Sequence, residues 1–374
     1  MDLCNIQYGY AFDSAAFTDE EAYPQLARIR DVKRGFSETY YKGEYPKEYV
    51  LSKGDLLIGM DGEFNIARWK TEGALLNQRV CKVTAKAGTD EEYLRFALSK
   101  ILKEIEGRTA FVTVKHLSTK ELSRVEFDVP EYTEQKHISR TLSLLESIIA
   151  ERQAELFKLD ELVKARFVEL FGDPKINEKN WDTGVVSQFY EVKGGKRIPK
   201  GMGYADGITA HPYLRATDMK NETILDDDIH YIDEDVFEKI KRYTVKGGDI
   251  YLTNVGVNLG MAGVIPDRYD GANLTENAVK LVPKTDAVLD GLFLAHYINS
   301  PGIQDYINER KMSVGVPKLA IFRIETMPLI LPPMDLQIGF INFCKQVDKS
   351  KVAVQKALNE AQLLFDSLMQ EYFG

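Results

Sequence analysis

The sequence has little cysteine and no long apolar run, and both absences narrow its possible classes. Its three cysteines, Cys4, Cys81 and Cys344, lie far apart and form no Cys-x-x-Cys pair, so neither a zinc site nor a redox motif is predicted. No stretch approaches the roughly 18 consecutive apolar residues of a membrane-spanning helix. The first residues have no basic region of the kind that opens a signal peptide. These absences predict a reduced, cytoplasmic protein that does not associate with a membrane.

Motifs for catalysis are also missing. The sequence contains no Walker A motif and no His-Glu-x-x-His, and its five histidines show no metal-ligand spacing. The Gly-rich segment 201–207 misses the dinucleotide-binding spacing by one residue and follows no clear apolar strand, so a flexible loop is the simpler interpretation. Nothing matches the Asn-Pro-Pro-aromatic motif of adenine methyltransferases. We therefore predict no catalytic residue, no metal and no cofactor in this chain.

Length and composition describe an ordinary globular protein with several domains. The 374 residues predict two or three domains. Hydrophobic residues at 44% and charged residues at 28% exclude disordered and low-complexity classes. The 48 basic and 57 acidic residues give a net charge of −9. Because nucleic-acid-binding domains are usually basic, the net charge taken alone argues against that class.

An internal repeat is the main positive signal. Residues 129–172 align without gaps on residues 331–374 at a constant offset of 202, with eight identities in 44 positions. In both copies apolar residues recur in alternating steps of four and three, which indicates a helix that packs along another helix. Proline precedes each helix, and Gly172 with Asp173-Pro174 ends the first. Each helix is expected to run roughly 40 residues, about 60 Å. The predicted packing residues are Ile138, Leu142, Leu145, Ile149, Leu156, Leu159, Val163, Leu170, Phe340, Val347, Val354, Leu358, Phe365 and Leu368.

The regions before the two helices repeat more loosely. The predicted organisation is a globular domain at 1–128, a long helix at 129–172, a second globular domain at 173–330 and a second long helix at 331–374. Each globular domain is predicted to be α+β, with strands such as 249–253 and 279–283 and helical spacing over 91–106 and 292–310. The sheet topology does not follow from the pattern. Matched helices that follow matched domains pack best antiparallel, in a coiled coil with pseudo-twofold symmetry. Two unrelated amphipathic helices in separate cores are the alternative.

Several short motifs recur in the same order in both halves. The pairs are Gly54-Asp55-Leu56-Leu57 with Gly248-Asp249-Ile250-Tyr251, Arg28–Asp31 with Arg215–Asp218, Pro130 and Gln135 with Pro332 and Gln337, and Gly9 with Gly195. The second half opens with Trp181-Asp182-x-x-Val185-Val186, which has no counterpart in the first. With this duplicated order the whole chain resembles the specificity (S) subunit of type I restriction–modification enzymes.

The resemblance implies a non-catalytic subunit that recognises DNA. It would contain two target-recognition domains, each reading one half of a bipartite double-stranded DNA sequence. The paired helices would act as a spacer and as the dock for two methyltransferase (modification) subunits, which would hold the S-adenosylmethionine. Restriction/translocase subunits would complete the complex. The alternatives are a specificity subunit of a type II-like restriction–modification enzyme and a coiled-coil interaction scaffold that binds no DNA.

If the chain binds DNA, local basic clusters must contact phosphates, because residues 1–128 and 173–330 each contain more acidic than basic residues. Base reading requires polar side chains on exposed loops. The loops 59–65 and 253–258 differ while the strands before them agree, as expected if they read different bases, although ordinary loop divergence and solvated turns are alternatives. The predicted base readers are Asp61, Asn65, Thr253, Asn254 and Asn258. The predicted phosphate contacts are Arg28, Arg30, Lys33, Arg34, Arg68, Lys70, Lys193, Lys196, Arg197, Lys200, Arg310, Lys311 and Lys318, with Lys239, Lys241 and Arg242 as further candidates.

Overall fold

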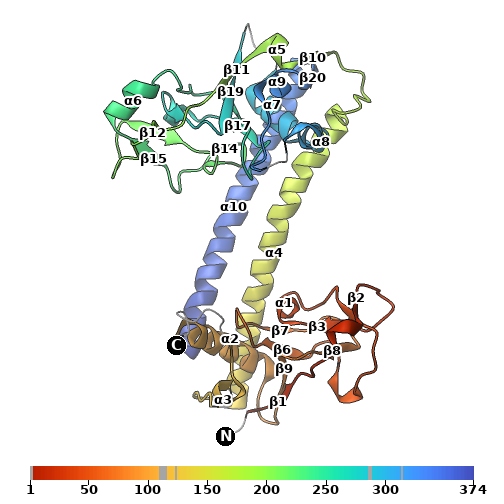
Figure 1. Ribbon diagram of the computed structural model, residues 1–374. Helices are drawn as coiled ribbons and strands as arrows, with labels where there is room; N and C mark the ends of the chain where they lie inside the picture. The colour runs from red at the N-terminus through yellow and green to blue at the C-terminus, as the bar shows by residue number, and fades with distance from the viewer. Residues whose placement is uncertain (1–2, 109–115, 123, 285–288, 313–314) are drawn as a thin grey trace. The chain divides into compact units, whose positions relative to one another are not determined.

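The computed structural model describes residues 3–108, 116–122, 124–284, 289–312 and 315–374 (Figure 1). It divides into two compact units, unit 1 with Met1–Ala154 and Gln355–Gly374, and unit 2 with Glu155–Val354. Each unit therefore contains one globular domain and the adjoining halves of both long helices. No helix within the described ranges is long and apolar enough to cross a membrane.

The globular domain of unit 1 is built on a four-stranded antiparallel sheet. The strand order is β1 (Cys4–Tyr8), β9 (Val80–Ala85), β6 (Leu56–Gly59) and β7 (Ile66–Arg68). Helix α2 (Glu91–Arg108) packs on β7 and β9, and the buried faces form an apolar core around Leu56, Val83 and Leu94. The smaller elements are β2 (Phe17–Thr18) with β4 (Tyr40–Tyr41), the sheet of β3 (Leu26–Ala27), β8 (Ala74–Leu76) and β5 (Val50–Leu51), and the helices α1 (Ile29–Val32) and α3 (Thr119–Leu122).

The globular domain of unit 2 repeats this plan. Its main antiparallel sheet has the order β11 (Tyr190–Gly194), β19 (Ala278–Pro283), β16 (Ile250–Thr253) and β17 (Ala262–Val264). A smaller sheet contains β15 (His230–Ile232), β12 (His211–Leu214) and β18 (Asn273–Leu274), and two pairs join β13 (Met219–Lys220) to β14 (Thr223–Ile224) and β10 (Thr183–Val185) to β20 (Pro328–Ile330). The short helices are α5 (Val186–Phe189), α6 (Glu234–Ile240), α7 (Gly291–Asn299), α8 (Pro301–Arg310) and α9 (Ile321–Glu325). The helical pattern over 292–310 thus divides at Pro301, which cannot donate the backbone hydrogen bond that a continuous helix needs.

The recurring Gly-Asp motif has the same structural role in both domains. Gly54 and Gly248 adopt positive φ angles of 99° and 82°, which favour glycine, at the turn before the central strand. The Asp55 carboxylate accepts a hydrogen bond from Ser52 N–H at 2.9 Å and pairs with Lys82 at 2.9 Å. Asp249 accepts from Lys246 N–H at 2.9 Å and pairs with Lys280 at 2.8 Å. This aspartate therefore closes the turn and ties the central strand to its neighbour.

The two long helices have equal length and equivalent starts. They are α4 (Tyr132–Phe171) and α10 (Met334–Phe373), 40 residues each, and both begin three residues inside the predicted ranges. Gln135 is buried near the start of α4, where its Oε1 accepts from Asp90 N–H at 2.8 Å and its Nε2 donates to the Pro130 carbonyl at 2.9 Å. Gln337 is buried near the start of α10, where its Oε1 accepts from Asp290 N–H at 2.9 Å and its Nε2 donates to the Pro332 carbonyl at 2.8 Å. Each glutamine therefore fastens a long helix to the domain that precedes it.

Within each unit the two helix halves pack antiparallel. In unit 1, Ile138 and Leu142 near the start of α4 form one buried cluster with Met369 near the end of α10. In unit 2, Phe167 and Phe340 lie 5.6 Å apart between ring centroids. All fourteen predicted packing residues are buried or half-buried. Lys351 stands at a position of α10 where the alternating steps of four and three predict an apolar residue. Its ammonium pairs with Asp160 of α4 at 2.5 Å.

Candidate nucleic-acid interface

Four segments meet at one edge of each globular domain, beyond the end of the central strand. We call this the variable edge. In unit 1 it comprises Gly9–Ala11, Met60–Asp61, Asn77–Arg79 and His116–Leu117, and in unit 2 it comprises Gly195–Arg197, Asn254–Val255, Thr275–Asn277 and Lys318–Leu319. These segments come from distant parts of the sequence, and the sheet brings them together.

Four backbone hydrogen bonds hold the variable edge in the same way in both units. Gly9 N–H donates to Val80 at 3.0 Å, as Gly195 N–H does to Ala278 at 3.1 Å. Three further backbone hydrogen bonds have an equivalent in the other unit. Tyr10 N–H donates to the Leu76 carbonyl (3.0 Å) as Lys196 N–H does to Leu274 (2.8 Å), and Met60 N–H donates to the Arg79 carbonyl (2.9 Å) as Asn254 N–H does to Asn277 (2.9 Å). Leu117 N–H donates to the Met60 carbonyl (2.7 Å) as Leu319 N–H does to Asn254 (2.8 Å). The backbone of this edge is therefore common to both domains.

The recurring glycine at the start of this edge is required sterically. A Cβ atom on Gly9 would lie 2.0 Å from the carbonyl oxygen of Asn77, and one on Gly195 would lie 2.0 Å from that of Thr275. Backbone atoms cannot move aside as a flexible side chain can. Only glycine lets the first segment lie against the turn before β9 or β19.

The side chains on this common backbone differ between the two units. Tyr10 in unit 1 occupies the position of Lys196 in unit 2, Asp61 that of Val255, Arg79 that of Asn277, and His116 that of Lys318. These equivalences follow from the matching backbone hydrogen bonds and from two single-residue β-bridges, one between Asp61 and His116 and the other between Val255 and Lys318. A constant frame that carries different polar groups is suited to reading two different base sequences.

In unit 1 the variable edge contains a carboxylate that holds two partly exposed side chains. Asp61 is buried, and its oxygens accept hydrogen bonds from Arg79 Nη1 and His116 Nδ1. The side chains of Arg79 and His116 remain 56% and 55% exposed. Burial alone would raise the pKa of the Asp61 carboxyl, but the hydrogen bonds from His116 and Arg79 outweigh it and lower the pKa below its usual value.

In unit 2 the basic loop that follows β11 contains both paired and unpaired cations. Lys193 pairs with Glu191 at 2.8 Å, and Arg197 pairs with Glu276 at 2.5 Å. Lys196 lies 5.7 Å from the centre of the Tyr243 ring, and no carboxylate of the described residues lies within ion-pair distance of Lys196 or of the exposed Lys200. Lys196 and Lys200 are thus the cations of this loop that can meet a phosphate without losing an internal ion pair.

The expected exposure of Thr253 and Asn254 is wrong. Thr253 is 0% exposed, and its hydroxyl bonds within the turn to the carbonyl oxygens of Asn258 and Met261. Asn254 is 5% exposed, and its Nδ2 lies 3.4 Å from the Leu319 carbonyl. These polar side chains support the edge from beneath because the loop folds back onto residues 316–319. Asn258 is half-buried and donates to the Ala216 carbonyl at 3.2 Å.

In unit 1 the other predicted reader, Asn65, is half-buried and donates to the Glu63 carbonyl at 3.0 Å. The cluster on α1 is largely internal. Arg34 donates to the buried Asp31, which also accepts from Ser37 Oγ at 2.9 Å. Lys33 pairs with Glu63 at 3.2 Å, while Arg30 donates to Thr39 at 3.2 Å and Arg28 lies 5.8 Å from the centre of the Phe17 ring.

The remaining predicted cations divide in the same way. Arg68 fastens β7 to α2, because its guanidinium donates to Glu91 at 2.8 Å, to Glu92 and to the Gly54 carbonyl at 2.7 Å. Lys70 is exposed and forms no ion pair with a described residue. The other contacts join Arg310 to Glu309 (3.0 Å), Lys311 to Asn308 (2.7 Å), Lys239 to Met202 (3.2 Å) and Lys241 to Glu238 (2.6 Å), while Arg242 has no such partner among described residues.

A family model described as "Type I restriction modification DNA specificity domain" matches residues 1–158 and 178–361. The chain belongs to this family. It is similar to the EcoBI specificity subunit of Escherichia coli, with 26% identity over 395 residues that cover 98% of this chain and 82% of the relative. It is also similar to the MjaVIII specificity subunit of Methanocaldococcus jannaschii, with 20% identity over 378 residues that cover 94% of this chain and 88% of the relative.

Solved structures of this family share the fold. The S subunit from M. genitalium aligns with a TM-score of 0.56 at 15% identity, covering 100% of this chain and 94% of that one. A structure from work on complex assembly and conformational transition of the type I restriction–modification system aligns with a TM-score of 0.57 at 15% identity, covering 99% of this chain and 97% of that one. Because the family model matches both halves of the chain, the two α+β domains are the target-recognition domains of a type I specificity subunit.

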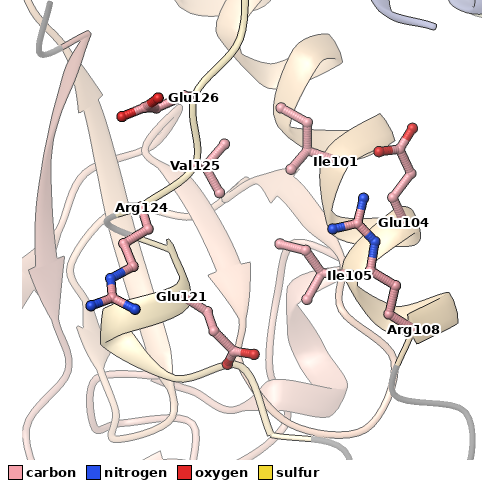
Figure 2. A pocket seen from close by; sticks show the side chains of 8 residues that line it. All are labelled: Ile101, Glu104, Ile105, Arg108, Glu121, Arg124, Val125 and Glu126. Atoms are coloured by element: carbon pink, nitrogen blue, oxygen red, sulfur yellow. The ribbon is translucent and has the colours of Figure 1, made fainter.

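A hollow of about 430 Å³ in unit 1 lies outside the variable edge, between the end of α2 on one side and Glu121 with residues 124–126 on the other. Figure 2 shows Val125 pointing toward Ile101 and Ile105 at its apolar centre. The polar residues around it carry both signs of charge: Glu104, Arg108, Glu121, Arg124 and Glu126. This mixture does not favour phosphate over any other ligand, so we assign the hollow no part in DNA binding.

Sequence reasoning missed two residues of the interface, Arg79 and His116. Neither belongs to a basic cluster, and Arg79 precedes a strand as a single cation. The signal that could have identified Arg79 is the repeat itself, because residues 73–78 align with residues 271–276 at a constant offset that continues to Arg79 and Asn277. Positions that differ within an otherwise matching segment deserved more weight than local charge density.

Proposed function

We propose that this specificity subunit reads a bipartite double-stranded DNA target through the variable edges of its two recognition domains, one half-site per domain. The observation that carries the proposal is the common backbone with different polar side chains. Direct readout requires different donors and acceptors for different bases, whereas the frame that approaches the groove can stay constant. Membership of the family supports DNA as the ligand.

Phosphate contacts are proposed for five of the predicted cations, none of which forms an ion pair with a described residue. They are Arg28, Lys70, Lys196, Lys200 and Lys318. Each contact of this kind releases counterions, so it weakens specific and random binding alike when it is lost. Lys196→Ala should therefore reduce affinity for both DNAs and flatten the dependence of affinity on salt. A loss confined to the specific site would contradict its assignment to a phosphate.

We also propose that the long helices dock protein partners, namely two methyltransferase subunits and, through the assembled enzyme, the restriction/translocase subunits. Large apolar side chains stand exposed on both helices in each unit. Leu144 and Leu363 are 62% and 73% exposed in unit 1, and Phe157 and Val352 are 65% and 71% exposed in unit 2. A protein partner that packs on these helices would bury this apolar surface, which is favourable in water. In this proposal the chain itself is non-catalytic and cytoplasmic, and the methyl donor belongs to the methyltransferase subunits.

The helices are further proposed to set the length of DNA between the half-sites. Inserting the same whole number of heptads into α4 and α10 preserves the packing pattern and moves the two domains apart along the helices. The unread spacer should then lengthen in the methylated sequence. An unchanged spacer would contradict the ruler function while leaving DNA recognition intact.

The decisive experiment is reconstitution with the modification subunits followed by sequencing of methylated sites. The complex should methylate one bipartite sequence, with two specified parts and an unspecified spacer. A complex that assembles and methylates DNA without sequence preference would contradict the proposal. A matched complex carrying Gly195→Ala serves as an internal control, because distortion of one variable edge should weaken recognition of one half-site only.

A further inference from the structure

Arg79 and Asn277 occupy the same place in the two variable edges. Each residue immediately precedes the strand next to the central strand, and its carbonyl accepts one hydrogen bond of 2.9 Å, from Met60 N–H in unit 1 and from Asn254 N–H in unit 2. The side chains beginning at this common backbone position are a guanidinium and a carboxamide. Arginine matches the O6 and N7 acceptors of guanine, and asparagine matches the N6 donor and N7 acceptor of adenine in the major groove.

The Arg79 side chain is held in place and still available. Its Nη1 donates to the buried Asp61, whose other oxygen accepts from His116 Nδ1. The opposite edge of the guanidinium, formed by Nε and Nη2, has no hydrogen-bond partner among the described residues, and the side chain is 56% exposed. That edge presents two parallel N–H donors, the arrangement needed for a bidentate contact. Because Asp61 already restricts the rotamers, little conformational entropy remains to be lost on binding.

Asn277 is less exposed than Arg79, but its side chain is also uncommitted. The side chain is half-buried, and its carboxamide has no hydrogen-bond partner among the described residues. The equivalent of Asp61 in unit 2 is Val255, which cannot hold a cation. The two units therefore differ at two neighbouring positions. In unit 1 the carboxylate of Asp61 lies beside Arg79, whereas in unit 2 the apolar Val255 takes the place of the carboxylate and Asn277 that of the arginine.

We propose that positions 79 and 277 are equivalent specificity-determining residues, with Arg79, held by Asp61, reading a guanine in the first half-site and Asn277 reading an adenine in the second. This inference rests on the proposed function, because it names the readers of the same two edges. Asp61 acts as a positioning residue through Arg79. It was predicted from the sequence to be a base reader, but its burial assigns it this indirect role.

The test uses the complex of this chain with its modification subunits and DNA in which each half-site position is randomised in turn. The readout is the ratio of methylation rates for the four base pairs at each position. Arg79→Lys keeps the charge but removes the fork, so the preference for guanine at one position should fall about 5- to 150-fold. Asp61→Asn should lower the same preference at the same position, because the neutral amide no longer holds the guanidinium firmly. Asn277→Ala should relax one adenine in the other half-site.

The matched control is Arg268→Lys. Arg268 is 51% exposed and pairs with Asp226 at 2.9 Å, outside the variable edge, so it offers the same kind of ion pair without the proposed contact. It should leave every base preference unchanged. Complex assembly, checked by size-exclusion chromatography, and the thermal midpoint of each variant separate a lost contact from a lost fold. Arg79→Asn, which gives unit 1 the side chain of unit 2, provides a second variant and should shift the preference from guanine toward adenine.

The outcomes separate this inference from the proposed function. A wild-type complex without sequence preference would refute the proposed function itself. A specific wild-type complex whose preferences survive Arg79→Lys and Arg79→Asn would refute the inference alone. A uniform loss of methylation on all substrates, with no change of preference, would assign Arg79 a structural role and overturn its assignment as a reader. A relaxed position that prefers a base other than guanine in the wild type would also overturn it.

Discussion

Replacing Gln337 by alanine should destabilise unit 2 selectively. The Gln337 side chain is 0% exposed, its Oε1 accepts from Asp290 N–H at 2.9 Å, and its Nε2 donates to the Pro332 carbonyl at 2.8 Å. Alanine leaves both backbone groups without these partners, the Pro332 carbonyl at a buried position and the Asp290 N–H at a half-buried one. Each such group costs about 1–3 kcal/mol, so the expected loss is about 2–6 kcal/mol before any cavity cost. For a unit of about 200 residues that corresponds to at least about 4 °C in the thermal midpoint.

The effect should be local as well as global, because Asp290 caps α7. Its carboxylate accepts from Leu292 N–H at 2.8 Å, while its own N–H belongs to Gln337. Hydrogen exchange measured by mass spectrometry should therefore rise first at the start of α7. Gln346→Ala is the matched control, since Gln346 is exposed on the same helix and its loss should cost no more than about 0.5 kcal/mol. Equal urea midpoints for the two variants, with unchanged exchange at α7, would refute the reasoning.

Three further predictions concern packing and pH. Gly195→Ala should cost about 1–3 kcal/mol by urea denaturation, because its Cβ would overlap a backbone oxygen, whereas Gly203→Ala, which meets nothing within 4 Å, should be nearly neutral. Leu142→Ala, at a site with 0% exposure, should cost about 2–5 kcal/mol, and Leu144→Ala on the exposed face under about 0.5 kcal/mol. The pKa of Asp61 is lower in the folded state than its value of about 3.9 in the unfolded state, so the ionised carboxylate stabilises the fold at pH values above about 3.9. This stabilisation disappears as the pH falls through the folded-state pKa. Asp61→Asn should therefore flatten the acid limb of a curve of stability against pH.

The architecture was largely predictable because it is repeated. The heptad pattern located the helices to within three residues, since apolar spacing, proline at the start and Gly172 with its φ of 74° at the end are all local signals. The sheet order β1-β9-β6-β7 was not predictable. It depends on pairing between strands more than 70 residues apart, such as Cys4 with Ala85, and strand periodicity carries no information about partners.

The interface was less predictable because a polar residue in a loop has two possible fates. Asn254 directly follows a strand, Arg79 directly precedes one, and both side chains carry hydrogen-bonding groups. The loop after β16 folds over Asn254 and leaves its Oδ1 without a hydrogen-bond partner among the described residues, while the turn before β9 exposes Arg79. Which fate applies depends on packing by residues 316–319 and 116–117, which lie far along the chain. Local sequence cannot report such an arrangement.

The net charge of −9 does not contradict DNA binding, because a total charge does not describe the charge at a particular surface. Many of the acidic residues lie beside cations that the fold uses internally, as Glu91 lies beside Arg68 and Glu276 beside Arg197. Such pairs add to both charge counts without adding to the charge available at a surface. In the proposed function, DNA binding depends on the cations and guanidinium donors that no described residue uses. Counterion release and base contacts both require groups that face DNA. In the proposed recognition of guanine, Asp61 lowers the net charge by one and still favours binding, because its buried carboxylate holds the exposed guanidinium of Arg79 in place.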